Sequence, residues 1–178
     1  MRARVVYESV FGNTEAAAAA IARGLGEFAE VESVDVAAPG PTSHSPVDLL
    51  VVGGPTHAFG LSRRRTRQEA ADRFGGPDVT GGATGIREWL EAEHRTSAGA
   101  RAAAFGTKMQ HPGHLPGSAA RGIGRRLRRA GFELVRRPID FYVVGMTGPL
   151  APGEFDRARS WAEHLASEEA DRRAQQSR

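Results

Sequence analysis

The 178-residue sequence contains no cysteine. This absence excludes disulfides, thiolate-bound metals, cysteine-held iron–sulfur clusters and a cysteine nucleophile. The sequence also has no apolar run of about 18 residues, the minimum for a membrane span, and it begins in strand-like residues rather than in a signal peptide. We therefore expect a cytoplasmic protein that does not associate with membranes.

Lysine is almost as scarce, because Lys108 is the only one and arginine supplies nearly all of the positive charge behind the net charge of +3. A nucleic-acid-binding surface would combine a basic stripe with interleaved aromatic side chains. The arginines instead lie on one side of helical stretches such as ARGIGRRLRRAG (120–131), opposite Ile123 and Leu127. The high arginine content is therefore better explained by a codon bias toward arginine than by binding to a nucleic acid.

Short apolar runs alternate along the chain with stretches of helical periodicity. The pattern predicts strands near 4–7, 31–36, 48–54, 101–106, 132–135 and 141–145. It predicts helices near 14–25, 62–74, 86–94, 118–131 (with Ser118 as N-cap) and from 152 onward. Repeated β/α units of this kind indicate one α/β domain over residues 1–166, with a parallel sheet covered by helices on both faces. Residues 167–178 are expected to form a polar C-terminal tail.

Ligands of such open sheets bind beyond the carboxyl ends of the strands, which directs attention to loops 8–14, 54–61 and 106–116. The first, ESVFGNT, offers backbone N–H groups from Val10 to Thr14 at the start of a helix, with Gly12 allowing close approach. It lacks the Lys-Ser/Thr of a Walker loop and the GxGxxG spacing, so a phosphate monoester held by neutral donors fits it best. The alternative is a simple helix N-cap.

The second loop, GGPTHAFG, also follows a buried strand, with Pro55 and Gly60 on either side of Thr56, His57 and Phe59. Two specialised loops at neighbouring strand ends favour a binding site over capping alone.

Three segments, YESVFGNT, DLLVVGGPTHAFG and FYVVGMTGPLAPGEFDRARSWAEHLA, resemble the flavodoxins, and the resemblance covers residues 1–166. It implies a flavodoxin-like three-layer sandwich with a five-stranded parallel sheet of order 2-1-3-4-5. It also implies non-covalent FMN, electron transfer with a redox partner protein, and a monomer or weak dimer. The implied cofactor-binding residues are Ser9, Val10, Phe11, Gly12, Asn13 and Thr14 for the phosphate, and Pro55, Thr56, His57, Phe59, Gly60, Gly106, Thr107 and Lys108 along the ring.

The sequence departs from the family at several points, which include a longer segment over residues 75–96. Phe11 stands where the family often has a threonine hydroxyl. Neither loop along the ring contains Tyr or Trp, so we expect His57 and Phe59 on one side of the ring, with Met109 or His111 on the other. Lys108 stands where acidic residues are usual, which predicts a less negative reduction potential.

Other functions remain open at this point. An FMN-dependent NAD(P)H:quinone reductase would use the same fold, and a flavodoxin-fold binding module could have lost its flavin. A phosphorelay receiver would need clustered aspartates where this chain has Glu8 and Gly53–Gly54. A metal at His111 and His114 is disfavoured, because histidines beside Pro and Gly are more often turn residues.

Overall fold

The computed structural model describes residues 1–38, 46–75, 84–92, 100–110 and 117–176. Its sheet contains parallel strands β1 (Arg2–Tyr7), β2 (Glu30–Asp35), β3 (Leu49–His57) and β5 (Arg101–Met109), with β2, β1, β3 and β5 side by side in that order. The predicted flavodoxin-like α/β fold and its strand order are therefore confirmed.

The fifth position of the sheet is divided between two short strands. Both β6 (Glu133–Leu134) and β7 (Ile139–Val143) pair in parallel with β5, along successive parts of it. Pro138 lies between them and has no N–H to donate to a strand ladder, so an unbroken strand is disfavoured there. The sheet gains one further strand, β4 (Gly60–Leu61), which forms a hairpin with the end of β3.

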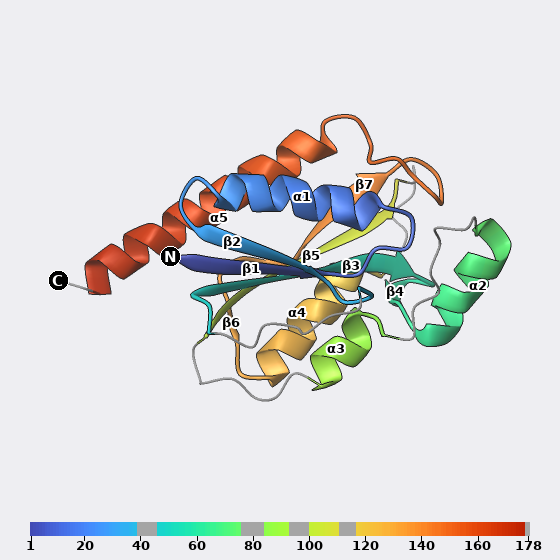
Figure 1. Ribbon diagram of the computed structural model, residues 1–178, viewed down its shortest axis with the longest axis horizontal. Helices are drawn as coiled ribbons and strands as arrows, with labels where there is room; N and C mark the ends of the chain where they lie inside the picture. Colours follow the sequence, from blue (N-terminus) through green and yellow to red (C-terminus); the bar gives the residue numbers. More distant parts are fainter. Residues whose placement is uncertain (39–45, 76–83, 93–99, 111–116, 177–178) are drawn as a thin grey trace.

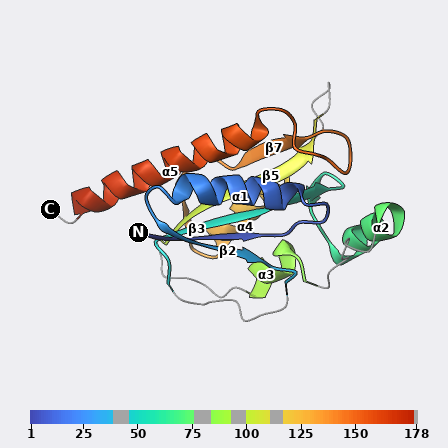
Figure 2. The ribbon, with the colours of Figure 1, turned by 45° about the horizontal axis from the view of Figure 1, so that its top comes forward.

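The helices form the two outer layers of a sandwich. One face of the sheet carries α1 (Asn13–Leu25) and α5 (Glu154–Gln176), and the other carries α3 (Ile86–Ala92) and α4 (Ala119–Arg129) (Figure 1). Helix α2 (Arg64–Phe74) covers neither face and lies beyond the carboxyl edge of the sheet, as both views show (Figures 1 and 2). No described helix is long and apolar enough to cross a bilayer.

Alternation along the strands divides the core into two halves. Val5 and Val51 are partners in the register of β1 and β3 and pack in the core beneath α1 and α5, whereas their neighbours Val6 and Val52 pack beneath α3 and α4. Successive side chains of a strand point to opposite faces, so a continuous apolar run serves both cores at once.

Gly53 and Phe105 are direct partners in the register of β3 and β5. A Cβ atom on Gly53 would lie 2.0 Å from Cζ of the Phe105 ring, so the ring fills the space that the glycine leaves open. This close fit joins the two central strands on the α1 and α5 face.

The polar segment after residue 166 is helical as far as Gln176, because α5 continues through it. Glu169 is only 2% exposed, and its Oε1 atom lies 2.7 Å from a guanidinium nitrogen of Arg101 at the start of β5. This ion pair fixes the last turns of the helix to the sheet. The polar sequence suggested a solvent-exposed side chain at position 169, but its ion pair with the partly buried Arg101 stabilises it in the interior.

Candidate functional site

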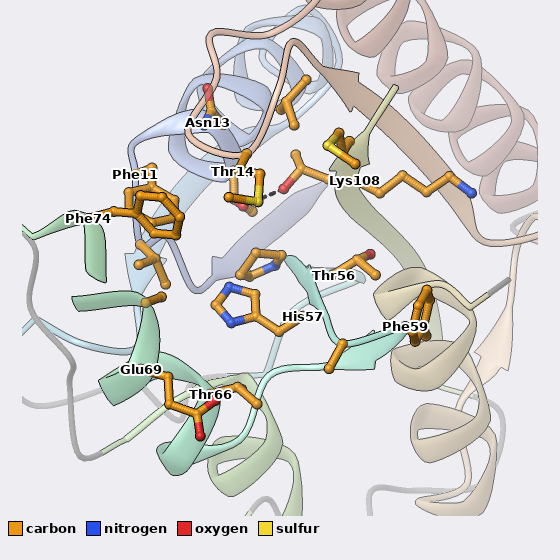
Figure 3. Close-up of a pocket in the computed structure, with 18 of the residues that line it drawn as sticks. Phe11, Asn13, Thr14, Thr56, His57, Phe59, Thr66, Glu69, Phe74 and Lys108 are labelled. Carbon is orange, nitrogen blue, oxygen red and sulfur yellow. Dashed lines mark hydrogen bonds between the residues drawn. The ribbon is translucent and has the colours of Figure 1, made fainter. Parts of the chain in front are cut away.

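A cavity of about 500 Å³ opens at the carboxyl edge of the sheet, where the segments after β1 and β3 meet the end of β5 (Figure 3). This volume is typical of small-molecule sites. The predicted residues that line it are Val10, Phe11, Asn13, Thr14, Pro55, Thr56, His57, Phe59, Thr107 and Lys108. Ser9, Gly12, Gly60 and Gly106 were also predicted and do not line it.

The loop between β1 and α1 presents unused backbone donors. Within the described residues, none of the N–H groups from Val10 to Thr14 donates to a protein acceptor, and the N-cap Gly12 makes no side-chain capping bond. Glu15 N, the next donor, bonds to Ser9 Oγ at 3.2 Å. Unpaired N–H groups at a helix N-terminus form an anion site, because the helix dipole adds positive potential there.

Gly12 has a φ of +78°, in the left-handed region that other residues avoid. A Cβ atom at Gly12 would meet no atom within 4 Å of it. The requirement for glycine therefore comes from the backbone conformation, and not from crowding by other protein atoms.

Two side chains of the same loop are already bonded within the protein. Asn13 Nδ2 donates to the carbonyl oxygen of Thr147 at 2.8 Å, and the hydroxyls of Thr14 and Thr107 lie 2.8 Å apart. The two hydroxyls have two hydrogens and use one between them. One hydroxyl hydrogen therefore remains to donate to a ligand. It belongs to whichever of Thr14 and Thr107 accepts in the bond between them.

Helix α2 supplies a wall of the pocket that the sequence analysis did not anticipate. Phe74 meets the Phe11 ring edge to face, with centroids 6.1 Å apart, so an aromatic pair replaces the hydroxyl usual at position 11. The sequence indicated this wall only weakly, because Ala70 and Phe74 form an apolar i, i+4 pair on a helix that is otherwise largely polar. The α2 residues that line the pocket are Thr66, Glu69, Ala70, Arg73 and Phe74.

A buried polar network holds α2 in place. Arg67, 1% exposed, donates to Ser62 Oγ and to Glu88 Oε2, both at 3.1 Å. Ser62 Oγ in turn donates to Glu8 Oε2 at 2.7 Å, and Ile86 N donates to the same oxygen at 2.8 Å. The network therefore ties α2 and the start of α3 to the end of β1.

His57 lies in the pocket between Thr14 and the α2 residues Thr66 and Glu69 (Figure 3). Burial lowers the pKa of the His57 imidazole below its ordinary value, and the charge of Arg67 acts in the same direction. The charge of Glu8 and a hydrogen bond to the Thr66 backbone oppose this shift without reversing it. The imidazole is therefore neutral at pH 7 and suited to contact an uncharged ring.

The hairpin between β3 and β4 turns through Ala58 and Phe59, whose φ values are +44° and +65°. Two-residue hairpins of this type normally place Asn-Gly there, because left-handed conformations strain other residues. The turn carries Phe59 to the rim of the pocket, on the side opposite Phe11 and Phe74, where the side chain is 60% exposed (Figure 3). Phe59 therefore borders the opening, whereas His57 reaches the interior.

Lys108 does not present an isolated charge. Its Nζ atom lies 4.0 Å from Asp140 Oδ2 and points away from His57 (Figure 3). Burial raises the pKa of the Asp140 carboxyl, while a hydrogen bond from Ser118 Oγ and the charge of Lys108 act against that rise. This ion pair joins β5 to β7 and offsets part of the Lys108 charge, while the expected effect of Lys108 on the reduction potential stays a prediction.

The alternative metal residues His111 and His114 lie outside the described residues. Within the described ranges, no group of three or more metal-binding side chains occurs. Met109, expected opposite His57, lines the pocket.

Comparison with known proteins indicates a single fold. No family model and no curated protein matches the sequence. Among solved structures, a flavodoxin from the domain Archaea aligns with a TM-score of 0.64 at 18% identity, over 96% of this chain and 99% of that one. Flavodoxin 2 from Bacillus cereus aligns with a TM-score of 0.63 at 21% identity, over 94% and 99%. A WrbA-like flavodoxin from Agrobacterium tumefaciens aligns with a TM-score of 0.59 at 18% identity, over 96% and 98%. Together with the strand order and the layers described above, these alignments show that the chain has the flavodoxin-like fold.

Proposed function

We propose that this chain binds FMN non-covalently in the pocket and acts in electron transfer with a separate redox partner. The observation that carries the proposal is the row of N–H groups from Val10 to Thr14, which have no protein acceptor within the described residues and which belong, except for Gly12, to residues that line the pocket. An anion is the ligand that such a row binds best. The flavodoxin-like neighbours support a flavin with a phosphate as that anion.

The remaining walls suit a flat, largely apolar ring. Pro55 and Met109 border the pocket on the sheet side, and Phe74 borders it on the α2 side. The neutral imidazole of His57 would contact the ring, and whichever hydroxyl accepts in the Thr14–Thr107 pair would donate its own O–H to the phosphate or the adjoining chain. FMN, when bound, supplies the electron chemistry, while the protein fixes its orientation and limits access of water.

A ligand titration tests this function. The purified chain is titrated with FMN and, separately, with riboflavin, and binding is followed by flavin fluorescence and visible absorption. We expect FMN to bind at least about tenfold more tightly, because charge-assisted hydrogen bonds to the phosphate contribute on the order of 1.5–3 kcal/mol. Equal affinities for FMN and riboflavin would refute the proposed role of residues 9–14 in binding the phosphate. If neither flavin binds, the proposed function is refuted, and the alternative of a flavodoxin-fold binding module without a flavin is favoured.

A further inference from the structure

Helix α4 carries a concentrated positive charge. Its sequence, AARGIGRRLRR, contains no acidic residue, and its buried side consists of small and apolar residues such as Ile123 and Leu127. Within the described residues, none of its arginines forms an ion pair with a carboxylate. We call this set the basic face; it consists of Arg121, Arg125, Arg126, Arg128 and Arg129.

Several arginines elsewhere in the fold are paired with carboxylates. On α5, Arg159 contacts Glu27 and Glu163, and Arg173 contacts Asp48. The contrast matters because unpaired like charges repel one another.

The basic face shows that repulsion at Arg126. Burial lowers the pKa of the Arg126 guanidinium, and the nearby charges of Arg87, Arg125 and Arg129 lower it further, whereas only Glu91 acts in the opposite direction. An anionic partner would relieve this repulsion.

Helix α4, which carries the basic face, begins beside the pocket. Gly117, just before α4, lines the pocket, and Ala119 N donates to Thr56 Oγ1 at 3.1 Å. The first turn of α4 is therefore held against the pocket wall, and the arginines extend from there along the helix.

Exposed apolar side chains border the same opening. Phe59 is 60% exposed and Met146 is 54% exposed, and both line the pocket. Exposed apolar side chains gathered around one opening indicate a contact surface, because isolated domains leave few such groups together in water. We call Phe59 and Met146 the apolar rim.

We propose that the basic face and the apolar rim form a docking surface for an acidic electron-transfer protein, and this proposal rests on the FMN function proposed above. Partner contacts would dehydrate the apolar rim at the pocket mouth, while the arginines would steer an acidic surface toward it. Nucleic acid is less well matched, since no aromatic residue interleaves with the arginines of α4.

The test uses one acceptor in two charge states. Native cytochrome c is basic, and the same protein with its lysines succinylated is acidic. The FMN-loaded chain is reduced anaerobically with limiting dithionite and mixed with either acceptor in a stopped-flow instrument. One electron then passes from the reduced flavin to the ferric haem, which becomes ferrous, and the haem absorbance reports the rate.

We expect the succinylated acceptor to react about tenfold faster than the native one at low salt, with a rate that falls as ionic strength rises. The Arg125→Glu/Arg128→Glu variant should lose most of this preference. The matched control is Arg2→Glu/Arg23→Glu, which changes the net charge equally at exposed positions on β1 and α1. It should keep the preference. FMN titrations on every variant verify that the cofactor site is intact.

Other outcomes overturn the proposal. A faster reaction with native cytochrome c, or equal loss in both double variants, would exclude steering by the basic face. Duplex DNA binding that disappears in Arg125→Glu/Arg128→Glu, with unchanged acceptor rates, would identify a nucleic-acid surface instead. If the chain fails to bind FMN, the proposed function fails, and calorimetric titration of the flavin-free chain with succinylated cytochrome c still tests the docking surface alone. Absence of binding there would refute it.

Discussion

The hydroxyl groups of Thr14 and Thr107 hydrogen-bond to each other at 2.8 Å, and both side chains are buried where the start of α1 meets the end of β5. Each threonine is thus a structural partner of the other as well as a pocket residue.

Replacing one of these threonines should lower the stability of the fold more than replacing both. Thr14→Val leaves the Thr107 hydroxyl buried without its partner, and we expect it to lower the free energy of unfolding by about 1–3 kcal/mol. The Thr14→Val/Thr107→Val double variant removes both polar groups and should lose less. Urea denaturation measures both, with the exposed Thr147→Val as control. A double variant that is less stable than Thr14→Val would contradict this account.

The conformation of Gly12 predicts a graded effect on FMN binding. Asn tolerates a φ of +78°, whereas a β-branched residue does not. We expect Gly12→Asn to retain most of the FMN affinity and Gly12→Val to lose about tenfold or more, because the N–H row would be reoriented. Riboflavin, measured in parallel, should be affected far less. Similar losses for both flavins would point to a general disruption of the pocket.

Burial of His57 predicts a dependence of stability on pH. Because its pKa in the folded protein is lowered, the unfolded chain binds a proton first as the pH falls below about 6.5. The stability present above that pH should therefore decline as the pH falls through the folded pKa, and His57→Gln should lose this component. Unfolding curves between about pH 5 and 8 measure it, with the exposed His164→Gln as control, and NMR titration of the imidazole reports the pKa directly. Identical pH profiles for the wild type and His57→Gln would disprove the assignment.

Arg67 should control the position of α2. Arg67→Met leaves Glu8 and Glu88 without their buried cationic neighbour, and we expect a loss of about 3–5 kcal/mol together with faster proteolytic cleavage in α2. Arg65→Met, on the exposed side of the same helix, breaks only an i, i+4 surface pair and should change neither measurement detectably. Equal sensitivity of the two variants to protease would show that α2 is held by other contacts.

A quinone reductase oxidises NADPH and reduces a quinone without another protein, whereas an electron carrier needs a separate reductase. We expect the FMN-loaded chain to exchange electrons with protein partners and to show little turnover with NADPH and a quinone alone. Steady-state NADPH oxidation under anaerobic conditions measures this. Rapid quinone reduction without any added reductase would favour the enzyme.

The parts of the site that lie on β1 and β3 could be predicted from sequence. Both loops follow apolar strands, and the carboxyl ends of parallel strands meet at one edge, so Val10 to Thr14 and Pro55 to His57 had to lie near each other. The N-cap at Ser118 could also be predicted, because it depends only on neighbouring residues. Its side chain accepts a hydrogen bond from Arg121 N as expected.

Features that depend on distant segments were not predictable in this way. Asp140 pairs with Lys108 only because β7 lies beside β5, and nothing near Lys108 in the sequence indicates it. The same holds for Phe74 against Phe11, and for Glu169, whose burial requires Arg101. Local polarity misjudged these positions because tertiary partners decide their burial.

The fit of Phe105 against Gly53 has an evolutionary consequence. A side chain at position 53 would occupy the volume of the ring, so no single substitution there is accessible while the phenylalanine remains. Truncation at position 105 would first have to open a cavity, at a typical cost of about 3–5 kcal/mol, before a larger residue at 53 could fill it. We therefore expect a change at position 53 to require a change at position 105, with a less stable protein as the intermediate step.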